Sequence, residues 1–210
     1  MIETMTDTIV QYFSDFTLVK AVDMAGLVLG LIYLWLEFKA SIWLWLVSVI
    51  MPIVHGYLYW ARGLYADFGM EVYYVLAAVY GYAMWRWARS HDRTKGKSDE
   101  LPITHFPLQR VLPVALVGLA LWGIIYWILV TWTDSTVPIC DSFTTALSMV
   151  ALWALAQKYA EQWLLWLVVD AVCTVLYIYK QIPFTACLYA FYTVMAVLGY
   201  RQWIKKIPTT

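Results

Sequence analysis

The sequence predicts an all-α integral membrane protein with seven transmembrane helices. The chain has 210 residues, of which 63% are hydrophobic and 13% are charged, and its mean hydropathy is +0.67. A soluble domain is usually about 25% charged, and a fold of this size in water could not cover so much apolar surface. The apolar residues also form continuous stretches rather than an alternating pattern, which favours membrane helices over a β-barrel.

Seven apolar stretches are long enough to cross the hydrocarbon core of a bilayer. Between the third and the fourth, the residues from Arg89 to Arg110 are rich in charge, and we expect them to form a solvated loop. The predicted spans lie near residues 20–38, 42–60, 68–88, 111–132, 141–157, 162–180 and 184–203.

The positive charges fall mostly on one side of this seven-span scheme. Loops that face the cytoplasm carry an excess of Lys and Arg, so we expect a cytoplasmic C-terminus and an outside N-terminus in the inner (cytoplasmic) membrane. Lys20, Arg62 and Lys180 fall on the outer side. The inner side carries Lys39, Arg86, Arg89, Arg93, Lys95, Lys97, Arg110, Lys158, Arg201, Lys205 and Lys206.

The two halves of the chain resemble one another, which predicts a duplicated three-helix unit. The predicted arrangement is one transporter domain over residues 1–210, with a repeat over about 20–88, a connecting span over about 111–132 and a second repeat over about 141–203. A single connecting span makes the repeats parallel, and transporters built in this way bind their substrate near the bilayer midplane. At an offset of 120 residues, Trp43 aligns with Trp163 and Tyr57 with Tyr177; at 118, Gly81-Tyr82-x-x-Trp85 aligns with Gly199-Tyr200-x-x-Trp203.

Asp170 is the best-placed ionisable residue within a predicted span. An ionisable side chain costs at least about 2.5–3.5 kcal/mol at the centre of a membrane helix, so it needs a partner or a function. Trp163, Trp166 and Asp170 fall at i, i+3 and i+7, on one face of a helix. Two aromatic rings beside a carboxylate form a plausible seat for a flat cation. The alternative is an aromatic stripe that packs on neighbouring helices.

Other polar residues at membrane depth extend the candidate site. Glu71 could balance a positive charge on a ligand, or could simply bond to a nearby Tyr. His55 follows Pro52 by three residues, and a lone His is more often a packing residue. Between the fifth and sixth spans we expect Gln157 to reach the cavity, while Lys158 and Glu161 form a solvated pair. The full predicted substrate site is Trp163, Trp166, Asp170, Glu71, His55, Gln157, Tyr177 and Trp43.

Several function classes find no support in the sequence. The formal net charge is zero, which gives no electrostatic basis for binding nucleic acid. Cys140, Cys173 and Cys187 lack the spacing of a zinc or redox site. No phosphate-binding loop, nucleophile–base pair or metal-ligand cluster is visible. We therefore expect neither an enzyme nor a cofactor, and the expected partners are a small cationic substrate and the lipid bilayer.

Several segments of the chain resemble the PnuC family of vitamin transporters. The resemblance covers about residues 20–205, and the E-x-W-x-x-W pattern in it is fairly specific. It implies a 3+1+3 fold similar to that of the SWEET sugar transporters, with Trp163 and Trp166 in the substrate region. The segments that carry it include Asp141-Ser-Phe-Thr-Thr-Ala, Glu161-Gln162-Trp163-Leu-Leu-Trp166, Thr185-Ala186-x-Leu188-Tyr189-Ala-Phe191 and Gly63-Leu64-Tyr65-Ala66-Asp67-Phe68-Gly69.

The resemblance also implies facilitated uptake of nicotinamide riboside, which a cytoplasmic kinase then traps by phosphorylation. Two positions depart from the family: Gln162 stands where Asn is common, and Glu71 stands where Asn or Gln is frequent. A carboxylate favours a cation, which argues against neutral riboflavin but does not separate the two cations nicotinamide riboside and thiamine. Nicotinamide riboside ranks first from its prevalence in the family, and thiamine is a close second. A sugar carrier and a membrane protein without a transport role are the competing interpretations, and a homo-oligomer is left open.

Overall fold

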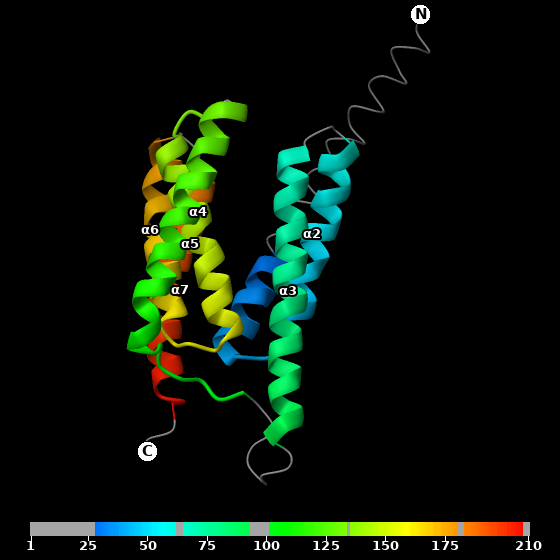
Figure 1. Cartoon of the computed structure of the whole chain (residues 1–210), viewed down its shortest axis with the longest axis vertical. Coiled ribbons are helices and arrows are strands. Elements are labelled where there is room, and N and C mark those ends of the chain that lie inside the picture. Colours follow the sequence, from blue (N-terminus) through cyan, green and yellow to red (C-terminus); the bar gives the residue numbers. More distant parts are fainter. Residues whose placement is uncertain (1–27, 62–64, 93–100, 134, 180–182, 208–210) are drawn as a thin grey trace, which may run out of the picture. The chain divides into compact units, whose positions relative to one another are not determined.

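A computed structural model of the chain describes residues 28–61, 65–92, 101–133, 135–179 and 183–207. Within these ranges the chain forms seven helices and no β-strand, which confirms the predicted all-α class (Figure 1). The first helix covers 28–39, and residues 20–27 of the first predicted span lie outside the described residues. The others are α2 (Trp43–Ala61), α3 (Tyr65–Asp92), α4 (Val111–Trp132), α5 (Pro138–Ala156), α6 (Gln162–Tyr179) and α7 (Pro183–Ile204), with a 3-10 turn, η2 (Leu108–Arg110), before α4.

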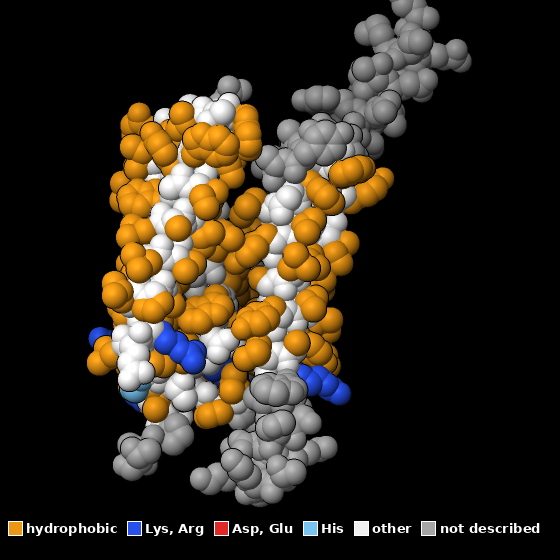
Figure 2. Space-filling model, viewed as in Figure 1, with side chains coloured by type: hydrophobic (Ala, Val, Ile, Leu, Met, Phe, Trp, Pro, Cys, Tyr) orange, Lys and Arg blue, Asp and Glu red, His pale blue; other side chains and the backbone are white. Residues whose placement is uncertain are grey.

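Three segments in the second half of the chain have the length and composition of membrane spans. They are Leu108–Trp132, Pro138–Ala156 and Gln162–Tyr179, and α2 contributes a shorter apolar stretch over Trp43–Tyr57. No residue of α4 is buried by the protein, so its apolar side chains need a lipid environment. Figure 2 shows hydrophobic side chains over most of the visible face of these helices.

The contacts divide the chain into two compact units, Met1–Ala78 and Val79–Thr210. In the first unit, Gly56 of α2 faces Glu71 and Phe68 of α3, and the ring edge of Trp60 meets Phe68 at 5.1 Å between centroids. In the second unit, α4 packs on α5, α5 on α6 and α6 on α7. The buried residues of α5 include Ala146, Ala151, Ala154 and Ala156. Such small side chains let membrane helices approach closely.

Two turns in the chain share one backbone conformation at a spacing of 118 residues. The first follows the helix over 28–39, and the second joins α5 to α6. Ala40 and Lys158 occupy equivalent places, with φ angles of 58° and 55°. These are left-handed values that usually belong to Gly at the end of a helix. Four backbone hydrogen bonds of the first turn recur 118 residues later in the second. In the first turn they are Ala40 N to Glu37 O (2.8 Å), Ser41 N to Leu36 O (2.9 Å), Leu44 N to Ser41 O (3.1 Å) and Trp45 N to Ile42 O (3.2 Å). In the second they are, in the same order, Lys158 N to Leu155 O (2.9 Å), Tyr159 N to Ala154 O (3.0 Å), Gln162 N to Tyr159 O (3.2 Å) and Trp163 N to Ala160 O (3.3 Å).

The bounds of the later helices agree with the same offset. Helix α2 ends at Ala61 and α6 at Tyr179, while α3 begins at Tyr65 and α7 at Pro183. The match of Trp43 with Trp163 at an offset of 120 was therefore wrong, because the residue equivalent to Trp163 is Trp45. Burial agrees: Trp45 is 2% exposed and Trp163 is 1% exposed, whereas Trp43 is 63% exposed. The parallel 3+1+3 arrangement of the two predicted repeats in space stays a prediction.

Candidate functional site

Trp163 is a packed residue at the start of α6. Its indole meets Trp203 of α7 edge to face, with 6.0 Å between ring centroids. A Cβ at Gly199 would stand only 2.5 Å from the Trp163 ring, so the absence of a side chain there lets the indole lie against α7. Both Trp163 and Trp203 are almost fully buried. The tryptophan therefore fixes α6 against α7 and holds the residues that follow it in place.

Three polar groups in the first turns of α6 have no hydrogen-bond partner among the described residues. These groups are buried without a hydrogen-bond partner in the described part of the chain: the side-chain amide of Gln162, through both its oxygen and its nitrogen, and the indole N–H groups of Trp163 and Trp166. An unsatisfied buried polar atom costs free energy, about 1–3 kcal/mol in mutational data. Gln162 can donate and accept, while each indole can only donate. A ligand that carries hydroxyl or carbonyl groups would satisfy these atoms.

Asp170 lies two turns further along α6 and is 7% exposed. Within the described part of the chain, no Lys, Arg or His side chain lies within ion-pair distance of its carboxyl group. Tyr192 of α7 is close enough to Asp170 to interact with it electrostatically. The predicted combination of Trp166 and Asp170 on one helix is thus present, with the carboxyl group buried in an apolar span.

Two further predicted residues of the second unit have protein partners. Gln157 donates from its amide nitrogen to the Tyr80 hydroxyl of α3 at 2.8 Å. Tyr177 stacks on Tyr189 of α7, with 5.2 Å between ring centroids and 15° between the planes. Both residues therefore tie α5 or α6 to a neighbouring helix.

In the first unit, the structure brings together two of the predicted residues. His55 Nδ1 lies 3.7 Å from Glu71 Oε1, and the Glu71 side chain is 13% exposed. Glu71 therefore has a neighbouring imidazole within the protein. Trp43, also in this unit, is largely exposed.

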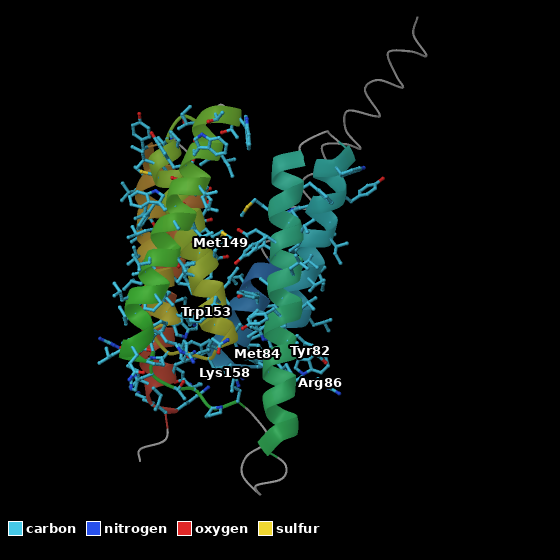
Figure 3. The ribbon with its side chains drawn as sticks, viewed as in Figure 1. Tyr82, Met84, Arg86, Met149, Trp153 and Lys158 are labelled. Carbon is cyan, nitrogen blue, oxygen red and sulfur yellow. The ribbon has the colours of Figure 1, made fainter. Side chains whose placement is uncertain are left out.

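The α5–α6 turn differs from its prediction as a solvated pair. Lys158 is only 3% exposed, and its ammonium group lies 4.2 Å from the centre of the Trp85 ring of α3. Figure 3 marks Lys158 just beyond the end of α5. The Trp85 indole also donates to the Ala156 carbonyl at 3.1 Å. These two contacts of Trp85 join α3 to the turn between α5 and α6. The Lys158 contact is favourable because the stem of a Lys packs well on an aromatic ring.

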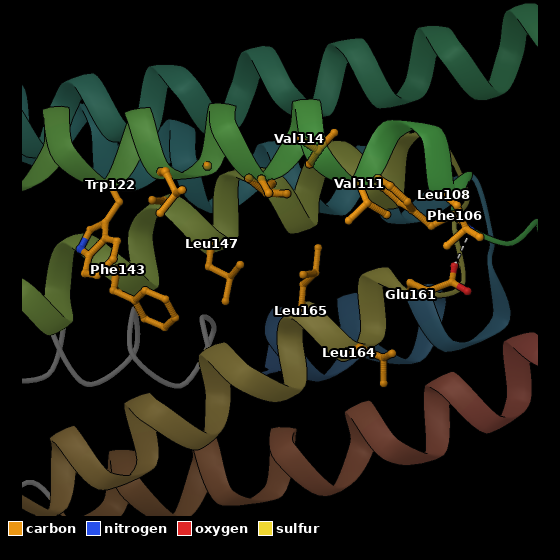
Figure 4. Close-up of a pocket in the computed structure, with 15 residues that line it drawn as sticks. Phe106, Leu108, Val111, Val114, Trp122, Phe143, Leu147, Glu161, Leu164 and Leu165 are labelled. Carbon is orange, nitrogen blue, oxygen red and sulfur yellow. Dashed lines mark hydrogen bonds between the residues drawn. The ribbon is translucent and has the colours of Figure 1, made fainter.

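Glu161 pairs with the linker before α4 rather than with Lys158. Its Oε1 lies 2.7 Å from His105 Nδ1, and its Oε2 accepts a hydrogen bond from the Phe106 backbone at 2.7 Å (Figure 4). Thr104 forms an isolated parallel bridge with Tyr159. Residues 101–110 were predicted as part of a solvated loop. The exposed side chain of His105 agrees with this, whereas Thr104 and Phe106 are half-buried and bonded to the α5–α6 turn. Residues 93–100 of that loop lie outside the described residues.

A groove of about 650 Å³ lies between α4, α5 and the start of α6 (Figure 4). Glu161 is the charged member of its lining, which contains none of the predicted substrate residues. Its apolar walls suit lipid rather than a polar vitamin. They are formed by Phe106, Leu108, Val111, Val114, Ala115, Gly118, Leu119, Trp122, Phe143, Ala146, Leu147, Val150, Glu161, Leu164 and Leu165.

Sequence reasoning missed the buried amide of Gln162, which appeared only as a departure from the PnuC pattern. The polar residue beside two tryptophans was the available signal. Metal binding has no basis in the described residues, where no group of three His, Cys, Asp or Glu side chains could hold an ion.

Comparison with known families gives one match over most of the chain. The family described as nicotinamide mononucleotide transporter matches residues 20–205. The crystal structure of the vitamin B3 transporter PnuC superposes with a TM-score of 0.64 at 24% identity, covering 86% of this chain and 79% of that one. At this identity the superposition shows a shared fold.

Curated relatives carry two different vitamins. The riboflavin/roseoflavin transporter RibM of Streptomyces davaonensis is 27% identical over 184 residues, which cover 86% of this chain and 83% of the relative. The nicotinamide riboside transporter PnuC of Escherichia coli is 23% identical over 207 residues, with 87% and 84% covered. A PnuC of Neisseria mucosa is 25% identical over 181 residues, with 80% and 66% covered.

Proposed function

Because the chain belongs to the nicotinamide mononucleotide transporter family, which includes PnuC, we propose that it takes up nicotinamide riboside across the cytoplasmic membrane. The family consists of membrane transporters, and the chain is therefore a transporter and not an enzyme. We further propose entry by facilitated diffusion, with the N-terminus outside and the C-terminus in the cytoplasm. A cytoplasmic kinase would trap the vitamin by adding a phosphate that cannot recross the bilayer.

The observation that carries this proposal is the buried carboxyl group of Asp170. It has no cationic partner among the described residues. A membrane-embedded carboxylate without a counter-ion is costly, and the pyridinium ring of nicotinamide riboside would supply the missing positive charge. The Trp166 ring could lie against that flat cation. The unpartnered donors of Gln162 and Trp166 would bond to ribose hydroxyls or to the carboxamide.

Riboflavin is the second candidate, and RibM supports it at 27% identity. The amide of Gln162 could serve a neutral ring as well as a charged one. Thiamine, ranked second on the sequence, has no support from these relatives, whose names give nicotinamide riboside and riboflavin. The charge on Asp170 is the property that separates the two remaining candidates.

Quenching of tryptophan fluorescence in the purified protein tests the substrate and the site together. We expect saturable binding of nicotinamide riboside. Asp170→Asn should weaken that binding about tenfold or more, since a hydrogen bond to a charged group contributes about 1.5–3 kcal/mol. The same substitution should leave riboflavin affinity unchanged, because a neutral ligand gains nothing from the charge. Thiamine serves as a second cation in the series.

Two tryptophan variants complete this experiment. Trp166→Ala should raise the Kd about tenfold, since a desolvated cation–π contact contributes about 2 kcal/mol. Trp127→Ala is the matched control, because Trp127 is 56% exposed on α4, and its affinity should equal that of the wild type. An Asp170→Asn protein that binds nicotinamide riboside as tightly as the wild type would overturn the cation assignment. Saturation by riboflavin alone would make the chain a RibM-like carrier.

A further inference from the structure

Four bonds join the linker segment Thr104–Phe106, which we call the clasp, to residues 158–161 immediately before α6. The Thr104 backbone N–H donates to Lys158 O at 3.1 Å, and Ala160 N–H donates back to Thr104 O at 3.0 Å. Glu161 then binds the next two residues of the clasp, one with each carboxylate oxygen. A fifth bond, from the Arg110 guanidinium to the Tyr159 hydroxyl at 2.9 Å, holds the far end of the linker.

Glu161 immediately precedes α6, which begins at Gln162. Its carbonyl accepts hydrogen bonds from Leu164 N at 3.0 Å and Leu165 N at 3.3 Å, which are the first bonds of the helix. A polar side chain at this position commonly caps its own helix. Here both oxygens of the carboxylate instead bind backbone and side-chain donors of the linker. The clasp is therefore bonded to the residue that precedes the first turn of α6.

The unpartnered polar groups of the proposed site come directly after Glu161 in the sequence. Gln162 is the residue after Glu161, and Trp166 lies one turn further on the same face. Their buried amide and indole groups have no partner among the described residues. A small rotation of the first turn would displace both groups together, and a binding site loses affinity when its polar groups are misplaced by even about 1 Å.

We propose that the clasp positions the vitamin site, with Glu161 and His105 as positioning residues that act through Gln162 and Trp166. The inference rests on the proposed vitamin binding. It assigns a function to a linker that lies outside the transmembrane helices. The side chains of His105 and Glu161 are 58% and 27% exposed. These two residues can therefore be substituted without disrupting the packing of the buried core.

Vitamin affinity in matched variants tests the proposal, with nicotinamide riboside and riboflavin as the probes. Glu161→Ala removes both carboxylate bonds and should raise the Kd of whichever vitamin binds about tenfold or more. His105→Ala removes one bond and should raise it about threefold. Glu161→Gln should stay close to the wild type, because its carbonyl can accept from Phe106 N–H while its amide donates to a neutral His105. Gln109→Ala, an exposed change in η2, should have no effect.

Hydrogen exchange at the first-turn amides of α6 gives a second measurement that needs no ligand. Exchange should be faster in Glu161→Ala and restored in Glu161→Gln. A Glu161→Ala protein with a lower melting temperature but an unchanged Kd would show a stabilising residue only and would overturn the proposal. If Glu161→Ala does not fold, His105→Ala carries the same test.

The two proposals can fail separately. A wild-type protein that binds neither vitamin would contradict the proposed function, and hydrogen exchange would still decide whether the clasp orders α6. A wild-type protein that binds one of them, with all clasp variants binding equally well, would contradict the clasp alone.

Discussion

The turns around Ala40 and Lys158 have the same backbone but different side chains in equivalent places. At the place of Leu44, which is fully buried in the first turn, the second turn has Gln162, which is also fully buried. Where the first has exposed Trp43, the second has Glu161 bound to the clasp. The two turns share a backbone conformation, and the polar side chains distinguish the turn beside the helix that we propose contacts the vitamin.

The largest change in stability should come from variants that test whether the two turns align at an offset of 118 or of 120 residues. Trp45→Ala removes a buried indole that is equivalent to Trp163 and should lower the free energy of unfolding by about 3–5 kcal/mol. Trp43→Ala, two residues away and largely exposed, should change it by no more than about 0.5 kcal/mol. Thermal unfolding in detergent measures both. An equal loss of unfolding free energy in the two variants would favour the alignment at an offset of 120 residues.

An intermediate effect should come from making the second turn more like the first. Gln162→Leu replaces the unpartnered buried amide by the residue found at the equivalent place. It should raise stability by about 1–3 kcal/mol, since the polar group loses its desolvation cost. The same variant should lose vitamin affinity. Stability and affinity that fall together would mean that the amide has protein partners instead of a ligand.

The smallest effect should come from the two left-handed residues. Ala40→Gly should stabilise the protein by about 1 kcal/mol, because glycine has no steric cost at φ 58°. Lys158→Gly gains the same relief but loses the side-chain contacts of Lys158, of which the one with Trp85 contributes about 0.5–1 kcal/mol, so it should be less stabilising than Ala40→Gly. Melting temperatures of the two variants give the comparison directly. A larger gain for Lys158→Gly would mean that the ammonium group is destabilising.

The helices were predictable because each is a long apolar run, and their observed bounds lie within a few residues of the predicted ones for α2 and α4–α7. The site was predictable in part. The spacing of Trp166 and Asp170 placed them on one helix, and both lie there. The packing of Trp163 on Gly199 was not predictable, because it depends on a missing side chain 36 residues away on another helix.

The errors also have physical causes. In a chain with 13 Trp and 16 Tyr, aromatic residues match by chance at several offsets. The equivalent turn hydrogen bonds, together with burial, identified Trp45 as the residue equivalent to Trp163. Lys158 was expected in solvent because most lysines near a helix end are solvated. Its burial depends on Trp85, which comes from a different helix. The clasp depends likewise on a contact between residues 104 and 159, which no local pattern reveals.

The constant offset of 118 keeps two buried tryptophans at the same distance along the chain from their turns. From Ala40 to the buried Trp85, and from Lys158 to the buried Trp203, the number of residues is the same although most side chains differ. A single inserted residue in a helix would rotate everything after it by about 100°. An insertion in α3 or α7 before its tryptophan would therefore turn that indole off the buried face of its helix.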